Sequence, residues 1–287
     1  MSLPVHSGIA AVADRYSAYI LDVWGVLHNG RAPYPGVREC LQRLRGAGKK
    51  VLLLSNAPRR AARVGAMLTR LGIPEAEYDH VVTSGELTRE ALAAGILGPT
   101  AKRYFCLGPE EDGGLLDGLD LQRVADVAAA DFILAIGFFD PQRDTLRSYA
   151  PLFAAARARD LPMLCANPDL EVMWGGRHLP CAGTLAQAYA AEGGAVRLFG
   201  KPIRETYDAV IRWLGLPPKA VLAVGDSLRT DIAGANGAGL DSLLVTGGIH
   251  APEWGLAPGD PPDVEKVAAA CAALGFWPSG LLASFRW

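Results

Sequence analysis

The chain has 287 residues, of which 50% are hydrophobic, so it is long enough for one large domain or two smaller ones with buried cores. Its 28 lysines and arginines nearly balance 30 aspartates and glutamates, and neither a basic surplus nor a polybasic run points to nucleic acid or a membrane surface. No apolar run approaches the ~18 residues of a membrane-spanning helix, and the first residues lack the pattern of a signal peptide, so we expect a cytoplasmic protein.

Short apolar runs recur along the chain, and each is followed by a turn or a polar residue. The runs that we predict as strands are 19–21, 51–54, 81–82, 132–136, 163–165, 221–224 and 243–245. Helix-like stretches lie between them, for example at 37–44 and 60–71, where apolar residues recur at helical spacing. Apolar runs that alternate with helices are typical of buried parallel strands, so the predicted fold class is α/β.

Polar residues stand where several of these predicted strands end. Asp22 follows the first strand, Ser55 and Asn56 follow the second, and Asp226 follows the run at 221–224 and its glycine. Each residue alone has an ordinary explanation as a turn or helix-cap residue. Ligands bind at the carboxyl edge of an open parallel sheet, however, so the residues together predict a binding site.

The residue types at these positions suit a phosphate ester, whose negative charge repels an attacking carboxylate unless the site neutralises it. Asp22 and Asp226 can hold Mg²⁺ through oxygen atoms. Lys201, in a Gly-Lys-Pro turn, can supply a positive charge, and the Ser55 hydroxyl with the amides after it can donate to phosphate oxygens. Asp22 can then act as a covalent nucleophile that forms an aspartyl-phosphate.

Five segments resemble motifs of the haloacid dehalogenase (HAD) superfamily, class IIA, the branch of NagD-like phosphatases. They are Asp-Val-Trp-Gly-Val-Leu at 22–27, Ser55-Asn56, Cys-Ala-Asn-Pro-Asp at 165–169, Gly-Lys-Pro at 200–202 and Gly-Asp-Ser-Leu-Arg-Thr-Asp at 225–231. The resemblance implies a Mg²⁺-dependent phosphohydrolase that acts on a small phosphorylated metabolite. It also implies three metal ligands, which are Asp22, Asp226 and the backbone carbonyl of Trp24. Asp231 would lie just outside these ligands.

The same resemblance implies two domains. A Rossmann-like parallel-sheet core would comprise residues 1–85 and 182–287, and an inserted α/β C2-type cap would comprise 86–181. Asn167 and Asp169 would lie on the substrate side of the junction, although an ordinary Asn-Pro-Asp turn also explains them. The aromatic tail at 276–287 is expected to pack on the core, with a homodimer contact as the alternative.

One position departs from the family pattern. Phosphatases of the family carry a second aspartate two residues after the nucleophile, whereas this chain has Trp24, whose indole is no general acid or base. The enzyme could be slow, could use substrates with good leaving groups such as acyl phosphates, or could take the proton from His28 or His250. A non-catalytic or regulatory protein that binds phosphometabolites, and a phosphotransferase, are the alternative functions.

Overall fold

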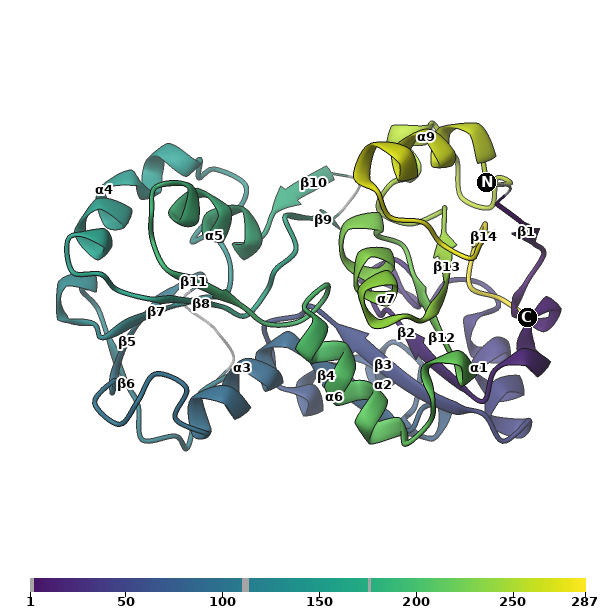
Figure 1. The fold of residues 1–287 in the computed structure, drawn as a ribbon, viewed down its shortest axis with the longest axis horizontal. Coiled ribbons are helices and arrows are strands. Elements are labelled where there is room, and N and C mark those ends of the chain that lie inside the picture. The colour runs from purple at the N-terminus through teal and green to yellow at the C-terminus, as the bar shows by residue number, and fades with distance from the viewer. Residues whose placement is uncertain (1–2, 110–113, 175–176) are drawn as a thin grey trace. The chain divides into compact units, whose positions relative to one another are not determined.

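The computed structural model describes residues 3–109, 114–174 and 177–287, and the chain divides into two compact units (Figure 1). The core unit comprises Met1–Ser55, Ala62–Val82 and Lys201–Trp287. The inserted unit comprises Asn56–Ala61 and Thr83–Gly200. The segment 86–181, which the sequence suggested as a cap, falls within the inserted unit, and that unit extends beyond it at both ends.

A seven-stranded sheet runs through the described part of the core unit. In order across the sheet its strands are β1 (Val5–His6), β14 (Gly280–Leu282), β13 (Asp241–Val245), β12 (Val221–Gly225), β2 (Ala18–Leu21), β3 (Lys50–Ser55) and β4 (His80–Thr83). From β1 across to β3, each strand pairs in parallel with its neighbour. Figure 1 accordingly shows the purple strand β2 beside the green strand β12, although the two are far apart in sequence.

Helices flank the core strands in sequence. They are α1 (Val37–Gly46), α2 (Ala61–Arg70), α6 (Arg204–Leu214), α7 (Ala233–Ala238), α8 (Ala251–Trp254) and α9 (Val264–Leu274). In α1 the buried residues Val37, Cys40, Leu41 and Leu44 recur at helical spacing, which explains why this segment forms a helix with one apolar face. Short 3₁₀ turns occur at Ile9–Ala11, Ala13–Arg15, Glu75–Glu77 and Pro218–Ala220. The helices predicted at 37–44 and 60–71 are confirmed within two residues at each end.

The inserted unit has a parallel sheet of its own. The strand order is β11 (Val196–Leu198), β8 (Met163–Cys165), β7 (Phe132–Ala135), β5 (Arg103–Leu107) and β6 (Gln122–Val124). Helices α3 (Ser84–Ala93), α4 (Leu146–Arg157) and α5 (Ala182–Ala191), and a 3₁₀ turn at Val127–Ala129, belong to the same unit. Strands β9 (Glu171–Trp174) and β10 (Arg177–Pro180) pair antiparallel outside this sheet. Within the five-stranded sheet each strand pairs in parallel with its neighbour.

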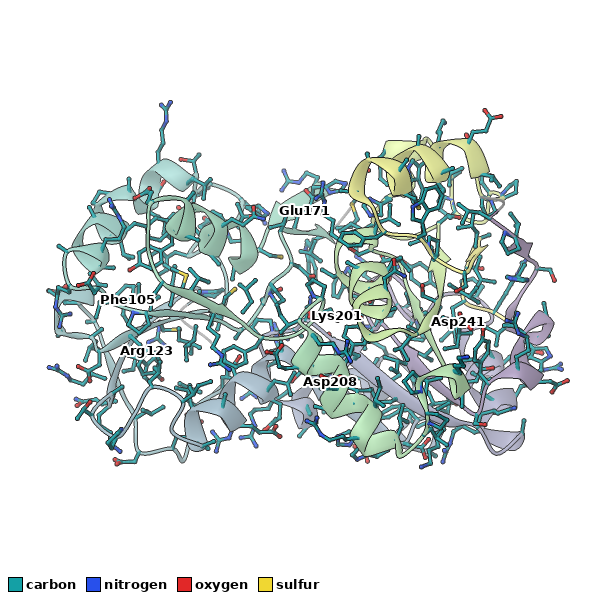
Figure 2. The ribbon with its side chains drawn as sticks, viewed as in Figure 1. Phe105, Arg123, Glu171, Lys201, Asp208 and Asp241 are labelled. Atoms are coloured by element: carbon teal, nitrogen blue, oxygen red, sulfur yellow. The ribbon has the colours of Figure 1, made fainter. Side chains whose placement is uncertain are left out.

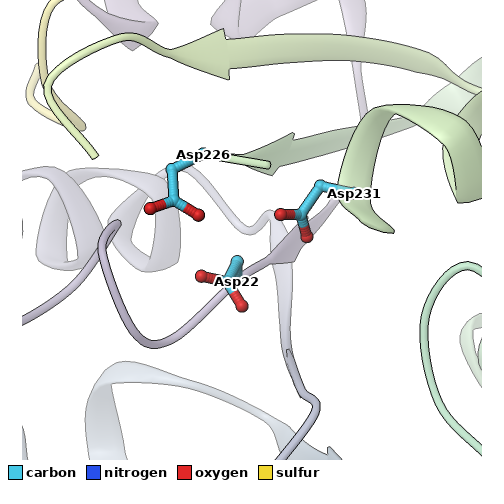
Figure 3. Close-up of side chains that lie close together, drawn as sticks. All are labelled: Asp22, Asp226 and Asp231. Atoms are coloured by element: carbon cyan, nitrogen blue, oxygen red, sulfur yellow. The ribbon is translucent and has the colours of Figure 1, made fainter. Parts of the chain in front are cut away.

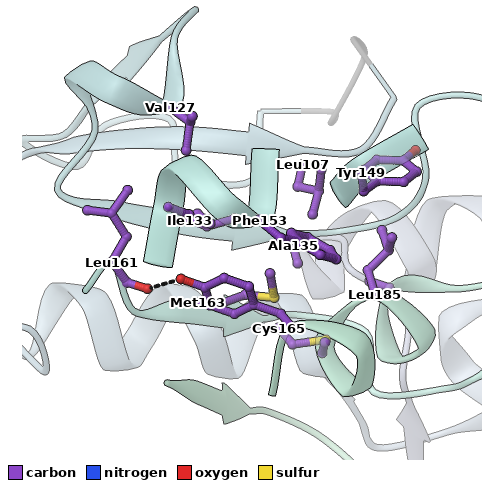
Figure 4. Close-up of a cluster of buried hydrophobic side chains, with 14 of the residues drawn as sticks. Leu107, Val127, Ile133, Ala135, Tyr149, Phe153, Leu161, Met163, Cys165 and Leu185 are labelled. Atoms are coloured by element: carbon purple, nitrogen blue, oxygen red, sulfur yellow. Dashed lines mark hydrogen bonds between the residues drawn. The ribbon is translucent and has the colours of Figure 1, made fainter. Parts of the chain in front are cut away.

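The inserted unit has an independent hydrophobic core, shown in Figure 4. Its buried members include Leu107 of β5, Ile133 and Ala135 of β7, Phe153 of α4 and Leu185 of α5. Because two helices and the sheet share these side chains, the unit buries enough apolar surface to be a domain in its own right.

Two further features concern the described residues. All five cysteines are buried, and none of them is in a disulfide. Among the helices described here, none has both the length and the apolar character needed to cross a bilayer.

Candidate active site

Three adjacent strands of the core sheet end in polar residues. Asp22 directly follows β2, Ser55 is the last residue of β3, and Asp226 directly follows β12. Because β12, β2 and β3 are neighbours and run parallel, their carboxyl ends meet at one edge of the sheet. All three side chains are buried. The sheet therefore brings these predicted residues together at the edge where parallel α/β sheets bind ligands.

A cluster of three buried carboxylates lies at this edge. One oxygen each from Asp22, Asp226 and Asp231 lies within 4.8 Å of the others (Figure 3). Asp231 is carried by a single-turn π-helix, Leu228–Ile232, and its Oδ2 accepts a hydrogen bond of 3.1 Å from the Ser227 N–H. Carboxylate oxygens are the ligands that hard divalent cations prefer, so this cluster has the donor set for one.

Lys201 forms ion pairs with two members of the same cluster. It lies just before helix α6, where Figure 2 labels it. Its Nζ donates to Asp22 Oδ1 and, at 2.8 Å, to Asp231 Oδ1, and the side chain is only 3% exposed. Three carboxylates thus share one ammonium. Burial raises the pKa of Asp226 well above its usual range, and repulsion from Asp22 and Asp231 raises it further. The excess of negative charge is what a bound cation would neutralise.

Two glycines let the carboxylates approach the backbone closely. Gly25 has a φ of 88°, and a Cβ there would lie 1.9 Å from Asp226 Oδ2. A Cβ on Gly225 would lie 2.0 Å from Asp231 Cγ. Both glycines are therefore required by space, and Gly25 is required by its backbone conformation as well.

Trp24 and His28 pack against each other beside the nucleophile position. They form an isolated β-bridge, and their rings meet edge to face with centroids 5.1 Å apart. His28 is wholly buried, and its Nδ1 accepts a 2.9 Å hydrogen bond from the Gly30 N–H. Burial lowers the pKa of His28 to about 4, so the ring is neutral near pH 7. This geometry argues against His28 as the proton donor.

His250 is also engaged by its neighbours. Its Nε2 accepts a 3.2 Å hydrogen bond from the Leu228 N–H, and its Nδ1 lies 3.2 Å from Glu253 Oε2. The next residue toward the N-terminus, Ile249, donates its N–H to Asp226 Oδ2 at 2.8 Å. The loop around His250 thus orients the carboxylate cluster through its backbone, while both imidazole nitrogens face other partners.

Tyr34 is a neighbour of the cluster that the sequence did not reveal. Its backbone N–H donates to Leu27 O at 3.0 Å, which brings the residue back beside the segment after Asp22. Burial, and then the negative charges of Asp226 and Asp22, raise the pKa of Tyr34 to about 12. A loop tyrosine carries no motif, so only the folded loop shows that it lies within electrostatic range of both carboxylates.

The remaining predicted residues belong to the inserted unit. Asn56 Nδ2 donates to Asp169 Oδ1 at 2.8 Å, and the Asp169 N–H donates to Asn167 Oδ1 at 3.2 Å. The second contact is the Asn-Pro-Asp turn that the sequence left as an alternative. Asn56 and Asp169 are therefore brought together, whereas Asn56 and Ser55 fall in different units despite being adjacent in the chain.

Comparison with known proteins gives a consistent set of relatives. Residues 19–122 match a family model described as haloacid dehalogenase-like hydrolase, and residues 198–270 match a related HAD-hydrolase-like model. A glycerol-3-phosphate phosphatase from Gallus gallus is 32% identical over 262 residues, which cover 85% of this chain and 83% of that protein.

Solved structures agree with this set. A haloacid dehalogenase-like hydrolase from Brucella suis has a TM-score of 0.83 at 35% identity, covering 98% of this chain and 99% of that one. A glycerol phosphate phosphatase from Mycobacterium tuberculosis, solved in complex with magnesium, has a TM-score of 0.64 at 27% identity, covering 83% and 70%.

Proposed function

Because this chain belongs to the haloacid dehalogenase-like hydrolases, class IIA, and is a phosphoric monoester hydrolase, we propose how it works. In this proposal it is a Mg²⁺-dependent phosphatase, and Asp22 is its nucleophile. The inserted unit corresponds to the C2-type cap of this class, and we call it the cap below. The proposal is carried by one observation, the buried group formed by Lys201 and the carboxylates of Asp22, Asp226 and Asp231.

The proposed reaction follows from the positions of these side chains. The Asp22 carboxylate attacks phosphorus, the ester bond to the leaving oxygen breaks, and an aspartyl-phosphate forms. Water then hydrolyses this intermediate, which releases inorganic phosphate and restores Asp22. Lys201 and the Ser55 hydroxyl lower the cost of bringing a phosphate dianion to a carboxylate, the first by its charge and the second by donating to a phosphate oxygen.

We propose Asp22, Asp226 and the backbone carbonyl of Trp24 as the residues that hold Mg²⁺. When bound, the ion supplies positive charge that offsets the repulsion between carboxylate and phosphate. Asp231 has both oxygens engaged, Oδ1 by Lys201 and Oδ2 by the Ser227 N–H. Its proposed role is therefore to position the Lys201 ammonium.

The indole of Trp24, which cannot act as a general acid, restricts the kind of substrate that we propose. General acid–base assistance is worth ~10²–10⁴ in rate, and neither His28 nor His250 faces the cluster in a way that would supply it. We therefore propose that the substrate is a small phosphorylated metabolite whose leaving group departs with little protonation. Trp24 also favours a second candidate, a regulatory protein that binds such a metabolite without turning it over.

Phosphate release from a panel of phosphomonoesters and acyl phosphates tests the proposal. The comparison is wild type against Asp22→Asn, with Mg²⁺ and with EDTA, and with the exposed Asp14→Asn as the matched control. We expect metal-dependent release that survives in Asp14→Asn and disappears in Asp22→Asn. Binding of phosphate without release from any substrate would support the regulatory candidate instead.

A further inference from the structure

The helical turn that carries Asp231 stands between two hydrogen-bond registers. The Ser227 carbonyl accepts hydrogen bonds of 3.1 Å from two successive N–H groups, those of Asp231 and Ile232. The first bond, from four residues ahead, is that of an α-helix, and the second, from five residues ahead, is that of the π-helix Leu228–Ile232. Because the two bonds have the same length, the Ser227 carbonyl does not by itself favour either register.

The register of this turn decides where the Asp231 side chain points. A π turn holds one residue more than an α turn, so closing it to the α register would rotate the residues on its two sides relative to one another by about 100°. Helix α7 behind the turn is fixed in the core by the buried Ala235 and Ala238, so the turn would have to move. As the turn stands, Asp231 points toward the other two carboxylates of the cluster (Figure 3) and accepts the 2.8 Å hydrogen bond from Lys201. This contact therefore depends on the π register.

Tyr207 of helix α6 bonds to the backbone of this turn. Its hydroxyl donates a 3.2 Å hydrogen bond to the Asp231 carbonyl, and its side chain is buried. Gly234 leaves the space for the ring, since a Cβ there would lie 2.2 Å from Tyr207 Cε2 and 2.6 Å from the hydroxyl oxygen. Burial raises the pKa of Tyr207, so the phenol keeps its proton and remains a donor near neutral pH. Tyr207 thus holds the Asp231 backbone through a bond that phenylalanine could not make.

Lys201 and Tyr207 belong to one short segment, and both bind Asp231. Lys201, just before α6, donates to the Asp231 carboxylate, whereas Tyr207, within α6, donates to the Asp231 carbonyl. Asp231 is therefore held at its side chain and at its backbone by two residues that are six positions apart in the chain. Because helix α6 fixes the spacing of these two donors, a rotation of the turn must break at least one of the bonds.

We propose that Tyr207 is a positioning residue for the phosphatase reaction. Its hydroxyl keeps the turn at 228–232 in the π register, and the Asp231 carboxylate then holds the Lys201 ammonium beside Asp22. The inference rests on the proposed phosphatase function, because it extends the role proposed for Asp231. Removal of the hydroxyl alone should loosen Lys201 while the Tyr207 ring position stays filled.

The test compares Tyr207→Phe with a matched control, Tyr19→Phe, in the full chain. Tyr19 is also buried in the core unit, and its hydroxyl also donates to a backbone carbonyl, that of Ala13, at 3.2 Å. Each variant loses one buried hydrogen bond of the same kind, so the two should lose similar folding stability. With Mg²⁺ and acetyl phosphate, we expect kcat/KM of Tyr207→Phe to fall by roughly 10–100-fold, since a misplacement of about 1 Å can cost ~10²-fold. Tyr19→Phe should stay near wild type.

Acetylation of Lys201 separates failure of this inference from failure of the proposed function, because it needs no turnover. Brief treatment with acetic anhydride in EDTA, followed by mass spectrometry, gives the rate at Lys201 relative to that at the exposed Lys219. In Tyr207→Phe we expect this relative rate to exceed that in Tyr19→Phe by roughly fivefold, the factor expected for one buried hydrogen bond.

The two measurements together decide the outcome. If no substrate is hydrolysed but the relative rate rises in Tyr207→Phe alone, the phosphatase proposal fails and the positioning of Lys201 by Tyr207 stands. Equal relative rates in the two variants overturn the positioning role whatever the activity. In an active enzyme, equal kcat/KM in Tyr207→Phe and Tyr19→Phe overturns it as well.

Discussion

Replacing Lys201 with methionine removes the positive charge at the centre of the site and leaves a side chain of similar length. The Lys201 side chain is 3% exposed, and its ammonium hydrogen bonds to Asp22 and Asp231. One oxygen from each of the three carboxylates of the cluster lies within 4.8 Å of the other two. In Lys201→Met these carboxylates face one another without a cation. The protein should therefore lose folding free energy as well as activity, most strongly when EDTA also removes divalent metal.

The size of the effect can be worked out from the contact with Asp231. At an effective dielectric constant of ~20, charges 2.8 Å apart attract by roughly 6 kcal/mol. The loss of hydration on burying the ammonium offsets several kcal/mol of this attraction. Removal of one partner of a buried ion pair typically destabilises a protein by ~3–5 kcal/mol. For a domain of this size that corresponds to a fall in Tm of roughly 6–20 °C.

Calorimetric unfolding in EDTA at about pH 7.5 measures the loss, with the exposed Lys219→Met as the matched control. The control should stay within ~0.5 kcal/mol of wild type. At about pH 5 the deficit of Lys201→Met should shrink, since protonation then relieves the repulsion among the carboxylates. Equal stability of Lys201→Met and Lys219→Met in EDTA would show that the Lys201 ammonium does not offset the repulsion among the three carboxylates.

Three further predictions concern the same site. The pKa of Asp226 is raised in the folded metal-free protein, so the stability that Asp226 contributes is fully present below its unfolded pKa near 3.8 and is lost as pH rises through the folded pKa. Urea unfolding in EDTA between about pH 4 and pH 8 should therefore show a falling free energy of unfolding in wild type and a flatter profile in Asp226→Asn. Gly25→Ala should cost ~1–3 kcal/mol in urea unfolding and weaken Mg²⁺ binding in calorimetry, whereas Gly48→Ala, at a positive φ with open space around it, should cost stability without affecting the metal. Trp24→Asp should raise kcat for alkyl phosphates by up to ~10²–10⁴ and change acetyl phosphate turnover much less, and a uniform change for both would refute the link between Trp24 and leaving-group protonation.

The sequence predicted the α/β class because a central parallel strand is buried on both faces. Strands β2, β3 and β12 are buried along almost their whole length, so they read as continuous apolar runs. Strands β6 and β10 were not predicted, since they are short and carry exposed polar residues, and β1 was not predicted because it has only two residues. Their pairing depends on strands that are separated from them in the sequence, or on a hairpin, and leaves no apolar run to detect.

The site was predictable where a residue's position follows from the sheet. Asp22, Ser55 and Asp226 converge because each stands at the end of one of three neighbouring strands. Tyr34 was not predictable, because its place depends on how one loop folds back on itself. Asp231 was expected beside the metal ligands from the resemblance of residues 225–231 to a family motif, whereas the π-helical turn that carries it could not be predicted from spacing.

The hydrogen bonding and burial of the two histidines were likewise beyond the sequence. A loop imidazole reads as a titratable group near physiological pH, whereas His28 is buried against Trp24 with its pKa lowered to about 4. Which ring nitrogen faces which partner is decided by packing after the backbone has formed. Sequence alone therefore indicated the residue types around the nucleophile but not their protonation.

The order of strands in the core sheet has a consequence for synthesis of the protein on the ribosome. Strand β2, which precedes Asp22, pairs on one side with β3 and on the other with β12, which is translated only after the whole cap. The cap, nearly continuous in sequence, can fold as it emerges, whereas half of the core sheet must wait with an unpaired strand edge. A nascent chain thus acquires Asp22 early but assembles its charge cluster late, and chaperone dependence during translation should concentrate in that interval.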